Sequence, residues 1–203
     1  MEIYLIRHGD CFKDTVDYYC RDKQTMNPPL TSKGIDQAHR LADRLKNIPF
    51  DKIYCSDLDR AKQTAEIIQT KLNTEIIISV NFREIDFGDI HKENKTWMDF
   101  PEIYRKWILH DEDIPYPNGE NGADVWNRCK KEIDNIITLE NKRIIIVCHG
   151  GTIRSIACGI LNIPQHKRFF LGFPLENCSI SIVQYKERNF YLHTFNDHFH
   201  ITQ

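Results

Sequence analysis

The sequence predicts an α/β fold, a three-layer sandwich in which helices cover both faces of a mostly parallel central sheet. Short apolar runs, which are typical of buried strands, alternate along the chain with segments whose apolar residues recur every three or four positions, as in helices. Such alternation is characteristic of parallel sheets that are buried on both faces. The 203 residues suit one domain, which we place at 1–203.

The first predicted strand covers residues 3–6, an apolar run that ends at Arg7. Thr31 can cap the helix that follows, because a threonine hydroxyl accepts a hydrogen bond from the open N–H groups of a first turn. The buried face of this helix is expected to consist of Ile35, Ala38, Leu41 or Ala42, and Leu45.

The second predicted strand covers residues 52–55 and leads into another helix, which we expect Ser56 and Asp57 to cap. Apolar residues at spacings of three and four mark that helix: Leu58, Ala61, Ala65, Ile68 and Leu72. A third strand is predicted at 76–78, where three isoleucines follow one another.

Residues 86–120 differ from the rest of the chain because they show no clean periodicity. They are rich in aromatic residues and contain three prolines after residue 100. Long irregular segments in compact domains are often functional loops. We therefore predict an insertion over the sheet that acts as a lid.

The pattern of strands and helices resumes in the last third of the chain. An amphipathic helix is marked by Val125, Cys129, Ile133 and Ile137. The strand predicted at 143–147 leads into a helix from about 152 to 161. Alternating residues at 179–185 and 190–195 predict two closing strands.

Composition and charge exclude several classes of protein. The net charge of -2 gives no bulk reason to expect nucleic acid or an anionic membrane as a partner. No apolar run reaches the ~20 residues of a membrane span, and the N-terminus does not resemble a signal peptide. The seven cysteines are scattered without a CxxC pair, which indicates neither zinc nor a disulfide framework. We expect a cytoplasmic protein.

Charged and polar residues follow several of the predicted strands. Ligands of parallel sheets bind beyond the carboxyl ends of the strands. The candidates at those ends are two arginines, two histidines, a glycine and a nearby carboxylate: Arg7, His8, Arg60, His149, Gly150 and Glu84. Together they predict an anion pocket that contains a nucleophile.

The chemistry that suits these residues is phosphoryl transfer, whose transition state needs fixed positive charge and directed donors. Arg7 and Arg60 supply planar forks that match two phosphate oxygens at a time. His149, when protonated, adds a charged donor, and Gly150 leaves its backbone N–H open to an anion at a helix start.

His8 is the candidate nucleophile. A neutral imidazole nitrogen can attack phosphorus directly, and the neighbouring arginines favour the neutral form. Glu84 is the candidate acid that gives the leaving alkoxide its proton. No metal ligands accompany His8 in the sequence, so we expect neither a metal nor another cofactor.

Six segments, in order from residue 3 to about 155, resemble successive motifs of the histidine phosphatase (phosphoglycerate mutase-like) superfamily. They are Leu5-Ile6-Arg7-His8-Gly9, residues 29–34 with Gln37-Ala38, residues 55–61 with Thr64-Ala65, residues 83–88, Gly119-Glu120 with Arg128, and residues 147–151. The resemblance, which favours the phosphatase branch, implies a phosphoglycerate mutase-like fold without a metal. It implies His8 as the phosphorylated residue and Glu84 as proton donor. The implied phosphate binders are Arg7, Arg60 and His149.

Two positions depart from the family pattern. The family often carries Ser or Thr two residues after the Gly of Arg-His-Gly, and Asn five residues after it. This chain has Cys11 and Asp14 at those positions, and the stretch 10–26 is longer than usual. We assign no role to either residue and expect this loop to be rearranged.

A rival interpretation uses the segment 148–154, which satisfies the Cys-x5-Arg pattern of cysteine-based phosphatases. In that chemistry Cys148 would be the nucleophile and Arg154 the phosphate clamp. It would leave His8, Arg60 and Glu84 without roles, and free cysteines are usually small buried residues. We therefore favour His8.

Two further alternatives share the site. A mutase would use the same residues, but mutases of the family tend to be longer and carry Arg-His-Tyr-Gly after the acid, where this chain has residues 85–88. A non-catalytic phosphate-binding module would have lost activity. We expect a small phosphorylated metabolite as the partner of a monomer or homodimer. The sequence leaves alpha-ribazole phosphate, a sugar phosphate, phosphoglycerate and broad specificity open.

Overall fold

The computed structural model describes residues 1–11, 27–91, 95, 97–172 and 174–202. Six strands form one sheet in the order β3-β2-β4-β1-β5-β6. They are β1 (Glu2–Arg7), β2 (Lys52–Cys55), β3 (Ile76–Ile78), β4 (Arg143–Cys148), β5 (Ile180–Lys186) and β6 (Asn189–Asp197). The neighbours from β3 to β1 run parallel, and β5 and β6 extend the sheet antiparallel. The predicted α/β class is confirmed.

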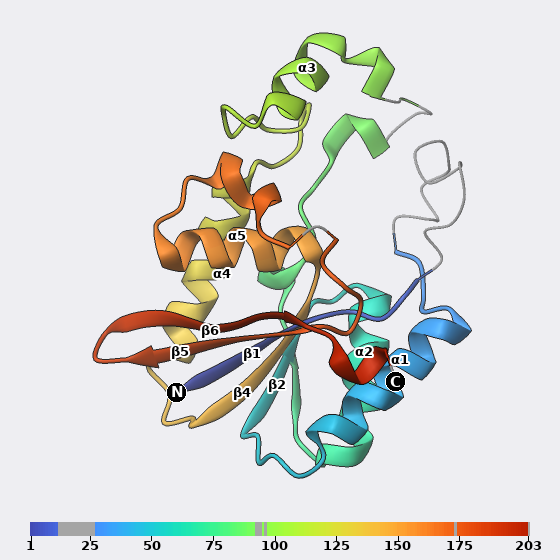
Figure 1. The fold of residues 1–203 in the computed structure, drawn as a ribbon, viewed down its shortest axis with the longest axis vertical. Coiled ribbons are helices and arrows are strands. Elements are labelled where there is room, and N and C mark those ends of the chain that lie inside the picture. Colours follow the sequence, from blue (N-terminus) through green and yellow to red (C-terminus); the bar gives the residue numbers. More distant parts are fainter. Residues whose placement is uncertain (12–26, 92–94, 96, 173, 203) are drawn as a thin grey trace.

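Helices cover both faces of this sheet (Figure 1). They are α1 (Ser32–Leu45), α2 (Asp59–Leu72), α3 (Pro101–Leu109), α4 (Gly122–Ile136) and α5 (Gly150–Leu161). One apolar cluster joins the sheet to α1 and α2, and a second joins it to α4 and α5. Side chains along β1 to β4 alternate between the clusters, as for Ile3 and Tyr4 on β1. The three predicted layers are therefore present.

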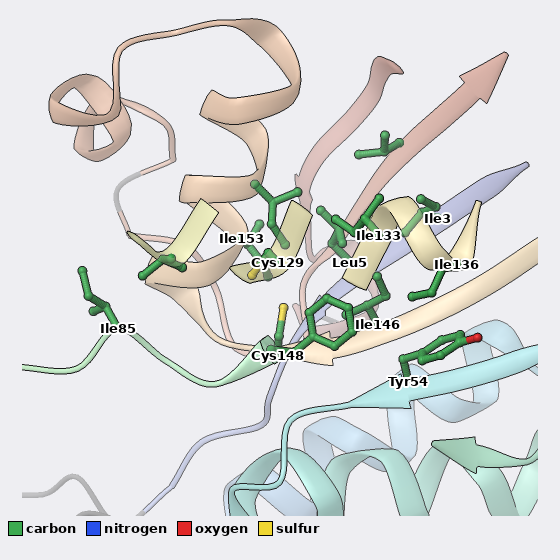
Figure 2. Close-up of a cluster of buried hydrophobic side chains, with 14 of the residues drawn as sticks. Ile3, Leu5, Tyr54, Ile85, Cys129, Ile133, Ile136, Ile146, Cys148 and Ile153 are labelled. Carbon is green, nitrogen blue, oxygen red and sulfur yellow. The ribbon is translucent and has the colours of Figure 1, made fainter. Parts of the chain in front are cut away.

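The cluster beneath α4 and α5 is drawn in Figure 2. Cys129 and Ile133 of α4 and Ile153 of α5 pack there against Leu5 and Ile146 of the central strands. Each of these side chains is at most 2% exposed. This packing fixes the start of α5 against the ends of β1 and β4.

One residue of the predicted face of α1 is wrong. Ile35 is 43% exposed, and Gly34 and Gln37 are buried in its place. Gly34 packs so closely on the carbonyl oxygen of Asp10 that a Cβ would overlap it. This contact rotates the first turn and turns Ile35 to solvent. Thr31 caps the helix as predicted, accepting from the Gly34 N–H at 3.0 Å.

The predicted cap of α2 is also wrong. The N-cap is Leu58, with no capping hydrogen bond from its side chain. The hydroxyl of Ser56 contacts His149 instead, and the carboxylate of Asp57 pairs with Arg83. Both side chains are engaged across the site rather than along the helix.

Residues 86–120 contain α3 and the short 3-10 helices η3 (Gly88–His91) and η4 (Trp97–Asp99). No residue of α3 is buried, and the helix projects beyond α5, away from the sheet (Figure 1). The segment is anchored where Asp113 pairs with Arg168 at 2.6 Å, in the 3-10 helix η5 (Gln165–Phe170). A role as a lid stays a prediction.

Strand register brings the candidate site residues together. Arg7 pairs with Cys148, and Cys55 pairs with Val147, so the carboxyl ends of β1, β4 and β2 lie side by side. The residues that follow these strands must therefore meet at one edge of the sheet, as the sequence predicts.

Candidate active site

His8 directly follows β1, and its side chain is 1% exposed. Its Nδ1 lies 2.7 Å from the carbonyl oxygen of Gly9, which can only accept a hydrogen bond. Nδ1 therefore carries the ring proton. Nε2 then holds the lone pair, and Arg60 Nε donates to it at 3.2 Å. The geometry describes a neutral imidazole whose Nε2 carries the lone pair that a nucleophile needs.

Gly9 fixes the backbone behind this ring. Its N–H donates to Thr64 Oγ1 at 3.1 Å, and the Thr64 hydroxyl donates to the Arg60 carbonyl at 2.7 Å. A Cβ on Gly9 would lie 2.6 Å from the carbonyl oxygen of Gly34, closer than any side chain tolerates. Glycine therefore lets the end of β1 lie tightly between α1 and α2, with the ring of His8 beside Arg60.

Arg7 presents an unused donor to the same edge. Its Nη1 donates to the carbonyl of Leu175, whereas its Nε is buried and has no hydrogen-bond partner among the described residues. Burial lowers the pKa of Arg7, and the attraction of Glu84 opposes that shift. Nε lies 3.6 Å from the point that a Cβ on Gly150 would occupy. A buried unpaired N–H beside a helix start suits an anion.

His149 and Gly150 begin α5, with His149 as the N-cap. The His149 ring is fully buried, and its centroid lies 5.0 Å from that of His8. Its Nε2 is 2.9 Å from Ser56 Oγ, which also accepts the Leu58 N–H at 3.3 Å. The two histidines that the sequence places at separate strand ends thus face one another.

Glu84 lies at the positive end of α5. Its carboxylate accepts the backbone N–H groups of Gly151 and Thr152, each at 3.2 Å. A Cβ on Gly151 would lie 2.5 Å from Glu84 Oε1, so glycine leaves the room that the carboxylate needs. The candidate acid is therefore held beside Gly150 and the guanidinium of Arg7, where Coulombic attraction acts between Glu84 and Arg7.

Arg128 holds the chain segment that carries Glu84. It donates to the carbonyls of Asn81 at 2.6 Å, Arg83 at 2.8 Å and Glu84 at 3.1 Å. It also forms an ion pair with Glu120 at 2.8 Å. Arg128 and Glu120 stand in the sequence only as parts of a motif, so this clamp is a role that sequence reasoning missed.

Ser56 and Thr64 are further contributors that sequence reasoning missed. Ser56 contacts His149, and Thr64 ties Gly9 to α2. A signal existed for each. Ser56 is a hydroxyl residue directly after a buried strand, and Thr64 lies one helical turn after Arg60, on the same face of α2.

The structure disfavours the cysteine-based rival. Cys148 is fully buried in the apolar cluster beneath α4 and α5. Burial raises the pKa of its thiol well above the usual value, so the thiolate that attack requires is suppressed. Two donor nitrogens of Arg154 are occupied by the carbonyls of Leu171 and Gly172.

The two positions that depart from the family pattern lie at the edge of the described region. Cys11 is buried and forms a backbone bridge with Leu30. Asp14 and the rest of the stretch 12–26 lie outside the described residues. In the part of the chain that is described, no cluster of three His, Cys, Asp or Glu side chains could hold a metal ion. No described helix is both long and apolar enough to cross a membrane.

Comparison with known proteins finds relatives over most of the chain. The chain is 31% identical to "Probable phosphoglycerate mutase GpmB" of Enterobacter sp. (strain 638) over 190 residues, covering 92% of this chain and 86% of the relative. It is 28% identical to "Phosphoserine phosphatase 1" of Hydrogenobacter thermophilus over 191 residues, covering 93% and 88%.

Solved structures match over nearly the whole fold. Bacillus stearothermophilus YhfR gives a TM-score of 0.82 at 27% identity, covering 98% of each chain. A phosphoserine phosphatase mutant from Entamoeba histolytica, solved in complex with phosphoserine, gives 0.77 at 27% identity, also covering 98% of each. The family model described as "Histidine phosphatase superfamily (branch 1)" matches residues 3–198. The chain therefore belongs to the histidine phosphatase superfamily.

Proposed function

We propose that this protein is a metal-independent phosphatase that hydrolyses a small phosphorylated metabolite through a phosphohistidine on His8. The observation that carries the proposal is the state of the His8 ring, with its proton on Nδ1 and its Nε2 lone pair facing Arg60. We also propose that the protein is cytoplasmic, has neither a nucleic acid nor a membrane as a partner, and is a monomer or homodimer.

The first chemical step forms a bond between Nε2 and phosphorus and breaks the bond between phosphorus and the ester oxygen. A bound phosphate gives Arg60 a charged acceptor, which frees Nε2 for attack. The N–H groups of Arg7 and Gly150, together with His149, stabilise the oxygens in the transition state. Protonated Glu84 gives its proton to the leaving alkoxide.

The second step is hydrolysis of the phosphohistidine. Water attacks phosphorus while the Glu84 carboxylate takes its proton, and the bond between Nε2 and phosphorus breaks. The hydrogen bond from His8 Nδ1 to the Gly9 carbonyl, at 2.7 Å, stabilises the positive charge of the ring while the phosphoryl group is attached. Phosphate leaves, and the ring returns to its neutral form.

The relatives support a small substrate. Three relatives at 27% to 31% identity carry names that refer to phosphoglycerate or phosphoserine. Both compounds are three-carbon phosphomonoesters that also carry a carboxylate. We propose that the substrate of this protein belongs to the same size class.

A phosphoglycerate mutase is the second candidate, favoured by the GpmB names among the relatives. It would use the same His8 and Glu84 but return the phosphoryl group to a second hydroxyl of the substrate. Incubation with 3-phosphoglycerate, with and without bisphosphoglycerate, separates the two activities. A phosphatase releases inorganic phosphate, whereas a mutase yields 2-phosphoglycerate.

The test of the proposal is a phosphatase screen over phosphorylated metabolites in the presence of EDTA. We expect activity with EDTA, loss of at least about 1,000-fold in His8→Ala, and retention in Cys148→Ser. Acid-labile phosphate on the wild-type protein would also exclude a non-catalytic binding module. An active His8→Ala protein, or activity that EDTA abolishes and a divalent cation restores, would overturn the mechanism.

A further inference from the structure

Arg154 is a third arginine beside the anion site, one helical turn after Gly150. Its Nε donates to the Leu171 carbonyl at 3.0 Å, and its Nη2 donates to the Gly172 carbonyl at 2.6 Å. Its Nη1 makes no hydrogen bond within the described part of the chain and lies 3.9 Å from the point that a Cβ on Gly150 would occupy. The guanidinium therefore runs back along α5 toward its first turn, with one nitrogen unused.

This position is electrostatically unfavourable for a cation. The N-terminus of a helix is its positive end, so an arginine there gains nothing from the helix dipole. Burial is the main cause that lowers the pKa of Arg154, and the positive charge of Arg7 lowers it further. The carboxylate that attracts Arg154 is Glu84, which also attracts Arg7. Two carbonyl hydrogen bonds and the attraction of Glu84 offset part of this cost and leave Nη1 without an acceptor among the described residues.

The balance of charge during the proposed reaction points to a ligand. When Glu84 is protonated to act as acid, the positive charges of Arg7, Arg60 and Arg154 exceed the charge of a bound phosphate dianion by one. Arg7 and Arg60 are needed at the phosphate itself. The unused nitrogen of Arg154 is thus available to another anionic group close to the phosphate.

We propose that Arg154 Nη1 binds a carboxylate of the substrate, and so selects phosphomonoesters that carry a carboxylate near the phosphate. One free nitrogen with two hydrogens suits a carboxylate better than a second phosphate, which needs donors on several sides. This inference rests on the proposed function and names its substrate class.

The test compares two substrates that differ only at the carboxylate, 3-phosphoglycerate and glycerol 3-phosphate. The wild type is expected to prefer 3-phosphoglycerate by about 10- to 100-fold in kcat/KM, which is the usual effect of one hydrogen bond to a charged group. In Arg154→Met the preference falls to near unity, mainly through KM, while the activity on glycerol 3-phosphate stays within about 3-fold. Equal loss on both substrates would show that Arg154 only ties α5 to residues 171–172, and would overturn the proposal.

A second variant covers a failure of Arg154→Met to fold. Arg154→Lys keeps the charge without the planar fork, and we expect it to keep a preference of about 3-fold or more. A wild type without any preference would overturn the proposal on its own.

Binding to His8→Ala separates this inference from the proposed function. Calorimetry should show tighter binding of 3-phosphoglycerate than of glycerol 3-phosphate, and this difference should vanish in His8→Ala/Arg154→Met. If the two ligands bind with different affinities but the wild type hydrolyses neither, the phosphatase proposal fails and the role of Arg154 stands. If the wild type hydrolyses both without a preference and the affinities are equal, the role of Arg154 fails and the phosphatase proposal stands.

Discussion

Replacing Arg128 by methionine tests whether the position of Glu84 depends on the clamp that holds its backbone. The guanidinium donates to three carbonyls of that segment, those of Asn81, Arg83 and Glu84. It also pairs with Glu120. Its side chain is 18% exposed, so water replaces these bonds only in part. Methionine keeps much of the volume and removes every donor.

The expected loss of stability follows from those bonds. A hydrogen bond to a charged group contributes about 1.5–3 kcal/mol, and breaking a mostly buried ion pair costs about 3–5 kcal/mol because the partner is left uncompensated. The contributions are not additive, since they share one guanidinium. We expect the free energy of unfolding to fall by about 3 kcal/mol, measured by urea denaturation.

The effect on catalysis distinguishes positioning from stability. A displacement of the acid by about 1 Å can cost about 100-fold in rate. The loss should concern kcat more than KM, because the phosphate-facing groups Arg7 and Arg60 are untouched. It should also be larger for alkyl phosphates than for p-nitrophenyl phosphate, whose leaving group needs little help from an acid.

Two further variants complete this experiment. All activities are measured under conditions in which circular dichroism shows that the proteins are folded. Arg143→Met removes an arginine that pairs with Glu2 at the opposite end of the strands, and should leave kcat unchanged. Arg128→Lys keeps the charge opposite Glu120 and should recover part of the stability but little of the alkyl phosphatase rate. If Arg128→Met hydrolyses both substrate types like the wild type, the clamp does not position Glu84.

Three other changes have expected outcomes. Ser56→Ala removes the hydroxyl beside His149 Nε2 and should weaken inhibition by vanadate about tenfold. The control is Ser179→Ala, whose buried hydroxyl has no hydrogen-bond partner among the described residues and which should be inhibited like the wild type. Equal inhibition constants for the two variants would refute the role of Ser56. Gly159→Ala places a Cβ against the ring of Trp126 and should lower the free energy of unfolding in urea by about 2 kcal/mol, without changing the activity per folded molecule. An unchanged midpoint of urea denaturation would contradict this packing. His200 has a pKa lowered to about 4, mainly by burial, with the charge of Arg44 as the next cause. The unfolded chain therefore binds a proton that the folded protein excludes, and stability contributed above pH ~6.5 is lost as the pH falls toward 4. After allowance for the partial exposure of His200, the free energy of unfolding should fall by about 1 kcal/mol less between pH 7 and pH 5 in His200→Gln than in the wild type. Equal decreases in both proteins would refute this.

The strands and helices could be predicted from the sequence because short apolar runs mark the strands, and apolar residues at spacings of three and four mark the helices. β4 is a run of isoleucines and valine between an arginine and a cysteine, and its limits follow directly. The first turn of α1 could not be predicted, because a close backbone contact between Gly34 and Asp10 decides which side faces inward. No periodicity records a contact between residues 24 positions apart.

The candidate site divides in the same way. Arg7, His8 and His149 could be located because strand ends of parallel sheets converge, and the register of β1 with β4 brings them together. Residues that act through backbone carbonyls leave no such signal. The side chain of Arg128 meets its carbonyl partners across 44 to 47 positions.

The two sides of the site should differ in how well they tolerate substitutions. The proposed nucleophile is fixed by the backbone, because the His8 N–H donates to the Cys148 carbonyl and β1 lies between β4 and β5. The proposed acid follows no strand directly, and its segment is held by side chains from α4, chiefly Arg128, and by the start of α5. Substitutions in the packing around Glu84 should therefore impair protonation of the leaving group before they impair attack by His8. Variants damaged at this point would still form phosphohistidine from activated aryl phosphates while losing their natural alkyl substrates, which a comparison of burst amplitudes on the two substrate types would detect.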